Sequence, residues 1–530
     1  MIALAPTWPK EDAPETAATA TPHKQAVGYV SGFLLPSADV SISAAARGIF
    51  ETIAPTHTLF MRGGKVHEIS EADGELILSP ITSAAFASRI ECYGKGVFAW
   101  RTGAKNEPVL KPTHCSGDVA KLLLETIEAG GLPQIESIVS APVLSAGGGD
   151  GDSLGKGYHA PLRLFVAKGE TPLEMELCEA KKALLDVLSD FDFVSPGDHA
   201  RAVASLISPA LKFGNLLPAD FPLDLAEANE SQSGKTYRQK LVCAIYGERA
   251  RVINRREGGV GGLDESISSA LVEGRPFIAL DNVRGRVDSQ ILESALRGHG
   301  HVPARVPHRG EVSVNTARFL WQLSSNGAET TRDLANRAVI TRIRKRSSGY
   351  PYKTWPEGST LEHITARQSY YLGAVFSIVK AWIAAGAPRT NEHRHDFREW
   401  VQTLDWICQK LMGTAPLLDG HREQQERAAN PALGWLRQVA LAVNENGDTG
   451  RELSASAILE LCELAGIDIP GSKGNPDVTQ IGRIMAKLFR EVASIEVDGF
   501  TVSRIIRTEY DIDRRKDIEV KRYQFQKCAL

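Results

Sequence analysis

The chain has 530 residues, a formal net charge of −3 at pH 7, and 43% hydrophobic and 24% charged residues, the composition of an ordinary globular protein. Its length exceeds what one hydrophobic core usually serves, so we expect two to four domains, a rough range for this length. The charge excludes a uniformly basic nucleic-acid-binding chain and leaves any such contact to local patches.

Seven scattered cysteines without a C-x-x-C pair argue against a disulfide framework or a zinc site and favour a cytoplasmic protein. No apolar run reaches the roughly 18 residues that a membrane span requires, so we expect no membrane partner.

Hydrophobic patterning divides the chain into five expected parts. Residues 1–25, rich in Ala, Pro and Thr, are expected to be a disordered leader. Residues 26–205 mix short strands with helices and predict an α+β domain, and residues 206–350 alternate strands and helices as in a parallel α/β sheet. Residues 351–445 are expected to be helical. Residues 446–530 read as helix, helix and two basic strands, the outline of a winged-helix DNA-binding domain.

A candidate phosphate-binding loop follows the apolar stretch FPLDLAEA. The pattern G-x-x-x-x-G-K-[ST] is matched except at its first position, where Asn229 replaces glycine; asparagine is the non-glycine residue that best tolerates a left-handed backbone there. Backbone N–H groups at a helix N-terminus, a lysine and a hydroxyl are what ATP phosphates and Mg²⁺ require. The predicted ATP-binding residues are Asn229, Glu230, Ser231, Gln232, Ser233, Gly234, Lys235 and Thr236.

Two further apolar stretches end in polar residues suited to catalysis. The first ends at Asp281, which with Thr236 is the predicted Mg²⁺ ligand pair. The second ends at Asn326, suited to aligning the attacking water. Arg337, with Arg332 as the fallback, is predicted to reach the ATP of a neighbouring subunit as an arginine finger.

The order GKT, IALDN, LSSN and DLANR resembles that of the AAA+ ATPases, and most closely the helicase-like ATPases of phages and integrative mobile elements, which share features with superfamily 3 and MCM-type helicases. Further similar segments include RREGGVGGLDESISSALVEGRPFIALDNVRG and NPALGWLRQVAL, and the resemblance covers about residues 130–530. It implies a P-loop core, a homo-oligomeric ring, expected to be a hexamer, ATP bound between subunits, and work on single-stranded or duplex DNA.

One departure bears on the chemistry. The residue after the Walker B aspartate is usually glutamate, whereas here it is Asn282, whose amide can orient water but cannot take its proton. Either another carboxylate serves (Glu265, Asp264 or Glu257) or hydrolysis is slow. The sequence therefore predicts an ATP-dependent DNA helicase or translocase, with a DNA-binding initiator that uses ATP as an assembly switch as the alternative. A structural subunit with a relic site is disfavoured by the intact motif residues.

Basic residues mark two candidate DNA contacts, each of which could instead be a solvated surface. The first is the segment with Arg297, His299, His301, Arg305, His308 and Arg309. The second is the C-terminal domain, with Arg483, Lys487, Arg490, Arg504, Arg507, Lys521 and Arg522. Histidines 393 and 395 and Asp396 could suggest a metal site, but we expect packing in that helical segment.

Overall fold

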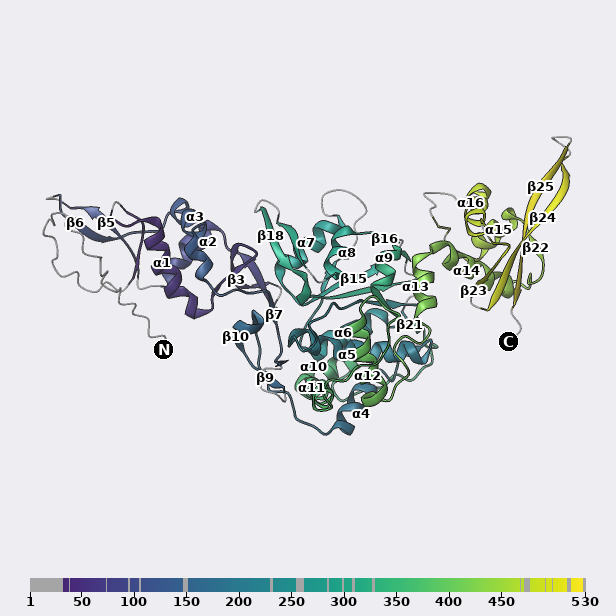
Figure 1. The fold of residues 1–530 in the computed structure, drawn as a ribbon, viewed down its shortest axis with the longest axis horizontal. Helices are drawn as coiled ribbons and strands as arrows, with labels where there is room; N and C mark the ends of the chain where they lie inside the picture. Colours follow the sequence, from purple (N-terminus) through teal and green to yellow (C-terminus); the bar gives the residue numbers. More distant parts are fainter. Residues whose placement is uncertain are drawn as a thin grey trace.

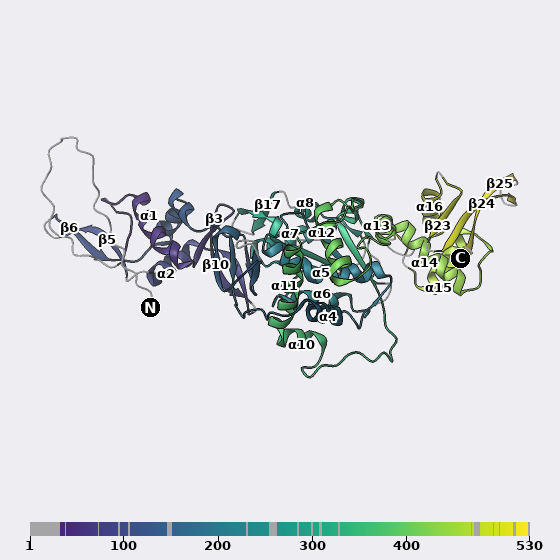
Figure 2. The same ribbon diagram turned by 60° about the horizontal axis from the view of Figure 1, so that its bottom comes forward.

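The computed structural model describes residues 32–527 except 38, 73, 94–95, 104–105, 146–150, 229–231, 254–261, 284–285, 298–299, 307–309, 327–328, 468, 471–476, 491, 498 and 512–515. The expected leader, residues 1–25, lies outside these residues. Three large hydrophobic cores follow one another along the chain. Figure 1 shows three successive bodies, with the body built on the core of Val139 to Ala428 in the middle. Figure 2 shows the same order from another side.

The N-terminal body packs three helices beside two three-stranded sheets. Its core joins Phe33, Phe50, Phe86 and Ile90, all at most 3% exposed. The sheets have the orders β1-β5-β6 and β2-β3-β4. The elements are β1 (Phe33–Leu34), α1 (Ile42–Ile53), η1 (Ala54–Thr56), β2 (Leu59–Arg62), β3 (Lys65–Ala72), β4 (Glu75–Pro80), α2 (Ser83–Tyr93), β5 (Val97–Thr102), β6 (Pro108–Pro112), α3 (Gly117–Leu124) and η2 (Ile127–Gly131).

Short strands connect this body to the next one. They form a sheet of order β10-β11-β7 and an antiparallel β8–β9 pair. The elements are β7 (Ser137–Val139), β8 (Val143–Ser145), β9 (Asp152–Leu154), β10 (Gly157–His159), η3 (Ala160–Leu162) and β11 (Leu164–Val166).

The central body is an α/β fold around a six-stranded sheet of order β12-β21-β13-β19-β15-β14. All neighbouring strands are parallel except β12, which pairs antiparallel with β21. The inner strand β19 is covered on both faces, and every one of its residues is buried. The strands are β12 (Asp192–Phe193), β13 (Leu223–Glu227), β14 (Arg251–Ile253), β15 (Phe277–Val283), β19 (Leu320–Ser325) and β21 (Ala338–Arg344).

Helices and small strands complete this body. The helices are α4 (Leu177–Val187), α5 (Pro196–Phe213), α6 (Lys235–Ile245), α7 (Leu263–Glu273), α8 (Gln290–Leu296), η4 (Thr316–Arg318), α9 (Arg332–Asn336), α10 (Thr360–Ala366), α11 (Gln368–Ala384), α12 (Arg398–Trp406), the π-helix η5 (Ile407–Met412) and α13 (His421–Ala429). The small strands are β16 (Arg286–Val287) with β20 (Glu329–Thr330), and the hairpin β17 (His301–Val306) with β18 (Gly310–Asn315).

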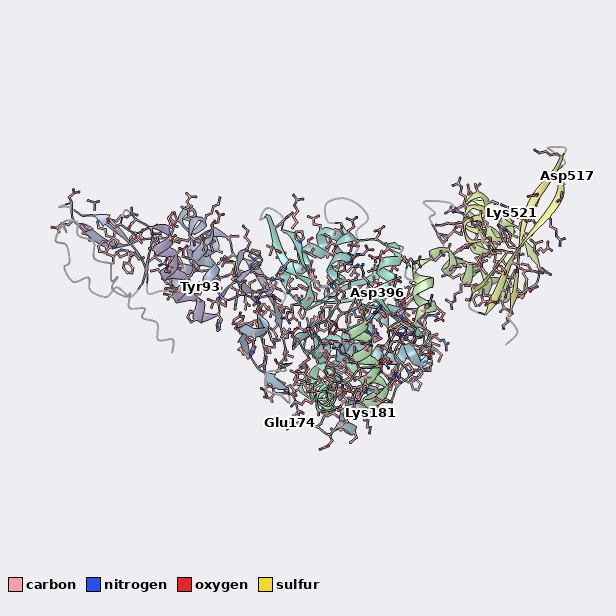
Figure 3. All side chains as sticks on the ribbon, viewed as in Figure 1. Tyr93, Glu174, Lys181, Asp396, Asp517 and Lys521 are labelled. Carbon is pink, nitrogen blue, oxygen red and sulfur yellow. The ribbon has the colours of Figure 1, made fainter. Side chains whose placement is uncertain are left out.

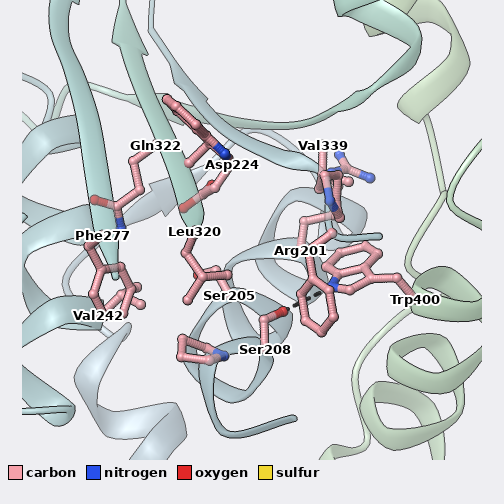
Figure 4. Close-up of a pocket in the computed structure, with 14 residues that line it drawn as sticks. Arg201, Ser205, Ser208, Asp224, Val242, Phe277, Leu320, Gln322, Val339 and Trp400 are labelled. Atoms are coloured by element: carbon pink, nitrogen blue, oxygen red, sulfur yellow. Dashed lines mark hydrogen bonds between the residues drawn. The ribbon is translucent and has the colours of Figure 1, made fainter. Parts of the chain in front are cut away.

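A small cavity of about 40 Å³ lies between α5 and the sheet (Figure 4). Its wall includes Ser208, Phe277, Trp321 and Trp400, and the Trp400 indole donates to the Ser208 hydroxyl at 3.1 Å. None of the predicted phosphate-binding or magnesium-binding residues lines it.

The C-terminal body has two helices beside a four-stranded sheet of order β22-β25-β24-β23, and a third helix joins its core. The expectation of only two strands here is wrong, because the first of them, SIEVDGFTVSRIIR, turns at Gly499 (φ +83°) and is divided into β23 and β24. The elements are α14 (Pro431–Glu445), β22 (Glu452–Leu453), α15 (Ala455–Ala465), α16 (Val478–Leu488), β23 (Ser494–Val497), β24 (Phe500–Asp511) and β25 (Lys516–Lys527). Figure 3 labels Asp517 and Lys521 on the β24–β25 arm, which extends away from the body.

The hydrophobic cores group the chain differently from the expected domain boundaries. Residue 205 lies inside α5, whose buried face belongs to the core of the central sheet. The helices that follow residue 350 join the same core as far as Ala428, and α14 packs in the C-terminal core. Across the described part of the chain, no helix combines the length and apolar character needed to cross a membrane.

Candidate nucleotide-binding site

Four of the predicted site residues meet where three parallel strands end: Lys235, Thr236, Asp281 and Asn326. Strands β13, β15 and β19 are hydrogen-bonded neighbours, so their carboxyl ends lie at one edge of the sheet. Helix α6 begins at this edge with Lys235, directly after Gly234. The sequence prediction of a strand, a loop and a helix around Gly-Lys-Thr is confirmed.

The described end of the loop has the backbone of an anion-binding turn. Gln232 and Gly234 have φ angles of +60° and +91°, the left-handed region that turns peptide N–H groups toward one side. A Cβ atom on Gly234 would stand 3.0 Å from the Phe191 ring, so both the backbone angle and the close aromatic neighbour favour glycine. Glycine also offers no side chain to cap α6, which leaves the first N–H groups of the helix for a ligand.

Lys235 lies across the mouth of the site. Its ammonium group donates to the Asn326 side-chain oxygen at 2.6 Å and to the Ser233 hydroxyl at 3.1 Å. Burial lowers the pKa of Lys235, and the carboxylates of Asp281 and Glu227 oppose that shift. The arrangement places a cation from α6 beside the polar end of β19.

Thr236 and Asp281 form the second half of the site. The Thr236 hydroxyl donates to the Asp281 carboxylate at 2.7 Å, and the Ser324 hydroxyl donates to the same oxygen at 2.6 Å. Strand β15 changes its pairing register between Leu280 and Val283, a local irregularity of the kind that re-aims side chains next to functional sites. A carboxylate and a hydroxyl within hydrogen-bond distance are hard oxygen donors, and they fit a Mg²⁺ ion bound together with nucleotide phosphates.

A buried polar layer holds α6 against the sheet. Arg238 forms an ion pair with Asp224 and donates to the Ser205 hydroxyl at 2.7 Å, with its own side chain fully buried. The Gln239 amide donates to the carbonyl oxygens of Asp224 and Leu323, each at 3.0 Å. These bonds connect α6 to both β13 and β19, and therefore set where Lys235 and Thr236 stand.

Several predicted residues cannot be placed in this geometry. Asn229, Glu230 and Ser231 lie outside the described residues, as does Glu257. Asn282 follows Asp281 in β15, but its side chain is also outside the described part. Asp264 and Glu265 lie in the first turn of α7, and the Asp264 carboxylate accepts from the Ser289 hydroxyl.

The two candidate finger arginines differ sharply. Arg337 is 6% exposed, donates to the Glu293 carbonyl at 2.7 Å, and forms an ion pair with Asp333 at 2.7 Å, all within its own chain. Arg332, at the start of α9, is exposed. In this conformation Arg337 connects α8 and α9, whereas Arg332 is exposed.

Sequence reasoning missed two residues of the site. Ser324 bridges Thr236 and Asp281, and its signal was its position two residues before Asn326 on the same strand. Glu227 is 1% exposed at the carboxyl end of β13 and influences the charge of Lys235. A carboxylate at the end of the strand that leads into a phosphate-binding loop was the available clue.

Most of the candidate DNA-contacting residues that the structure describes are exposed. His301 and Arg305 are exposed on β17 of the β17–β18 hairpin, whereas His299, His308 and Arg309 lie outside the described residues. Arg297, at the end of α8, is within 3.8 Å of Asp333. On α16 and the residue that follows Phe489, the side chains of Arg483, Lys487 and Arg490 are exposed.

Two basic residues of the β24–β25 arm have different surroundings. Arg507 forms a close ion pair with Glu452, and Lys521 is exposed opposite Ile506.

The expected packing role of His395 agrees with the structure. Its ring is 4% exposed, lies beside the Ala338 carbonyl oxygen at 3.3 Å, and accepts from the Phe397 N–H. No grouping of three potential metal-binding side chains occurs among the residues that the structure describes.

No protein-family model and no curated protein matches the chain. Among solved structures, it is similar to the active helicase Cch of SCCmec type IV, with 10% identity, 89% of this chain and 97% of that one covered, and a TM-score of 0.28. Two inhibitor- or compound-bound structures of JCV helicase match with 13% and 14% identity and TM-scores of 0.21 and 0.20. They cover 39% and 40% of this chain, and 61% and 66% of their own. Because these identities and TM-scores are low, the proposed function rests on the chain's own residues.

Proposed function

We propose that the protein is a Mg²⁺-dependent ATPase that works on DNA as a helicase or translocase of mobile-element type, with ATP bound between the subunits of a homo-oligomeric, hexameric ring. One observation carries the ATPase part. Residues separated by up to 91 positions, from Lys235 to Asn326, converge within hydrogen-bond distance at the carboxyl edge of a parallel sheet, in front of a helix N-terminus.

Each residue of the cluster has a role that its position supports. The N–H groups around Gly234 and the Lys235 ammonium would hold the phosphate oxygens, and Thr236 and Asp281 would hold Mg²⁺. The bound ion would neutralise the charge that develops on the phosphates. Asn326, which lies next to Lys235, would orient the attacking water, and Arg332 would reach the ATP of the neighbouring subunit.

The DNA part is supported by exposed basic residues on the β17–β18 hairpin and on α16. Arg483 and Lys487 are four residues apart on α16 and therefore lie on one face of the helix, and Arg490 is exposed just beyond its end. Such a face can follow a phosphate backbone, and its contribution should weaken with salt.

A second candidate function is a DNA-binding initiator or regulator that assembles on ATP and hydrolyses it slowly. The observation that favours it is Asn282, an amide at the position where a general base is expected after Asp281. Under this proposal Asn282→Glu should accelerate hydrolysis, since a general base contributes about 10²- to 10⁴-fold. Under the helicase proposal another carboxylate already serves, and the variant should change turnover little.

The deciding experiment measures ATP binding, ATP hydrolysis and DNA binding by the parent chain, with and without single-stranded DNA. The helicase proposal expects turnover that DNA stimulates, and the initiator proposal expects ATP-dependent DNA binding without that stimulation. Lys235→Ala is the control and should abolish ATP binding. A parent chain that neither binds ATP nor assembles with it would contradict both.

A further inference from the structure

We propose that the β2–β3–β4 sheet, together with Glu136, is a brace that holds the β17–β18 hairpin in a set position relative to α7 and β15. Glu136 is then a positioning residue for the hairpin's contact with DNA, and this consequence rests on the proposed function. The contacts themselves do not depend on it. Three of them join the brace to the end of α7, to strand β18 and to the base of the hairpin.

The first contact fixes the end of α7. Arg62, the last residue of β2, is 3% exposed and donates to the carbonyl oxygens of Leu271 and Val272. These carbonyls belong to the last turn of α7, where the helix has no further N–H partners to offer and carries partial negative charge. Burial lowers the pKa of Arg62 to about 10, so its side chain is still a cation at neutral pH.

The second contact fixes the hairpin strand β18 against the turn between β2 and β3. Gly63 has φ +54°, and a Cβ atom there would lie 2.2 Å from the Ser313 carbonyl oxygen. The turn therefore packs backbone against backbone on β18, at a distance that any side chain would prevent.

The third contact fixes the base of the hairpin. One oxygen of the Glu136 carboxylate accepts from the Asn315 amide at 2.9 Å and from the Arg318 guanidinium at 3.1 Å, while the other accepts from Arg163 at 3.2 Å. The side chains of Glu136 and Arg318 are only 13% and 16% exposed, so this is a largely desolvated ion pair. Asn315 ends β18 and also caps the turn η4, which leads into β19.

The brace also reaches the start of β15. After α7, the chain turns at Gly274, whose φ is +72° and whose missing Cβ would stand 2.8 Å from the Leu78 side chain of β4. The Ile138 N–H donates to the Gly274 carbonyl at 3.4 Å. Strand β15 then runs to Asp281 at the nucleotide site. The β2–β3–β4 sheet thus contacts the β17–β18 hairpin on one side. On the other side it contacts the turn at Gly274, which precedes β15, the strand that carries Asp281.

This arrangement assigns the N-terminal body a mechanical role. If the hairpin is to transmit work between DNA and the nucleotide site, its base needs a fixed support, because a freely hinged hairpin would move without moving β15. We expect loss of the Glu136 bonds to loosen the hairpin and uncouple DNA from turnover, while the ATP site itself stays intact.

The test compares Glu136→Ala and Glu136→Gln with Glu71→Ala, which removes an exposed carboxylate from β3 of the same sheet. Amide hydrogen exchange is measured in the full chain. In Glu136→Ala we expect residues 301–315 to exchange roughly tenfold faster or more, because buried charged hydrogen bonds are lost, with no change over 235–245. Glu136→Gln keeps an acceptor for Asn315 and should fall between the parent and the alanine variant. Exchange over 301–315 that matches the parent in both variants would overturn the brace.

The DNA consequence is read separately. ATP affinity and DNA-free turnover should be the same in all three variants, whereas the ratio of DNA-stimulated to basal turnover should fall toward one in Glu136→Ala alone. Faster exchange with unchanged stimulation would overturn the coupling role and leave the brace as a purely structural contact. If the parent itself shows no DNA stimulation, the proposed function fails, and the exchange result still decides whether the brace exists.

Discussion

Replacing Asp281 by asparagine separates the charge of the site from its hydrogen bonds. In the parent one carboxylate oxygen accepts from Thr236 at 2.7 Å and from Ser324 at 2.6 Å. The asparagine side-chain oxygen has the same shape and can accept both bonds. We therefore expect the fold to lose only about 1 kcal/mol, the net value of one hydrogen bond.

The loss of charge should have a much larger effect on the metal. Two unit charges 4 Å apart interact with about 4 kcal/mol at an effective dielectric constant of about 20, and Mg²⁺ carries two charges. Even the single-charge value of about 4 kcal/mol corresponds to roughly 10³-fold in affinity. We expect Asp281→Asn to weaken Mg²⁺ binding in the presence of ATP by at least about this factor and to abolish turnover at millimolar Mg²⁺.

The assay titrates Mg²⁺ against a fluorescent ATP analogue and measures phosphate release in parallel. Metal-free nucleotide should bind the variant about as well as it binds the parent, since Lys235 and the loop N–H groups remain. Ser324→Ala is the matched control, because it removes one hydrogen bond to the same oxygen without changing the charge, and its Mg²⁺ affinity should change less than about tenfold. Parent-like hydrolysis and Mg²⁺ dependence in Asp281→Asn would refute the assignment of β15 as the magnesium-binding strand.

The other predictions concern the interface, the buried support of α6 and pH. Arg332→Ala should bind ATP but hydrolyse it poorly, and mixing it with Lys235→Ala should restore activity; Arg337→Ala should instead lower the unfolding midpoint, because it removes the buried side chain that joins Asp333 of α9 to the Glu293 carbonyl of α8. Arg238→Ala should lose about 3–5 kcal/mol of stability in denaturant titrations, since it leaves Asp224 without its buried partner, whereas exposed Arg483→Ala should lose almost none. His421 accepts from the Ile340 N–H, and burial, Arg201 and His395 hold its pKa well below the usual value, so the folded chain binds a proton there less readily than the unfolded chain. Stability should therefore fall as the pH drops below about 6.5, and His421→Gln should flatten that dependence by up to about 1.4 kcal/mol per pH unit; an unchanged pH profile would contradict the role of this histidine.

The sequence alone predicted which segments meet at the candidate nucleotide site, because that prediction depends on local rules. Apolar runs marked the strands that end at Glu227, Asp281 and Asn326, and Gly-Lys-Thr marked the start of α6. Parallel strands with helices between them must bring their carboxyl ends to one edge, so residues 91 positions apart could be expected to meet. The sheet order and the exact partners, including Ser324 as the bridge between Thr236 and Asp281, required the tertiary structure.

What the sequence could not determine are the properties that depend on a residue's surroundings. Arg332 and Arg337 are the same residue type, and only the packing of the folded chain exposes Arg332 and buries Arg337 in an ion pair with Asp333. The cores cross the expected boundaries because α5 and the helices after residue 350 cover the sheet, and pattern alone does not show which apolar faces meet. Glu136, Arg62 and Gly63 carry no motif, and their importance arises from contacts with residues about 180 to 250 positions away, a separation that no local signal spans.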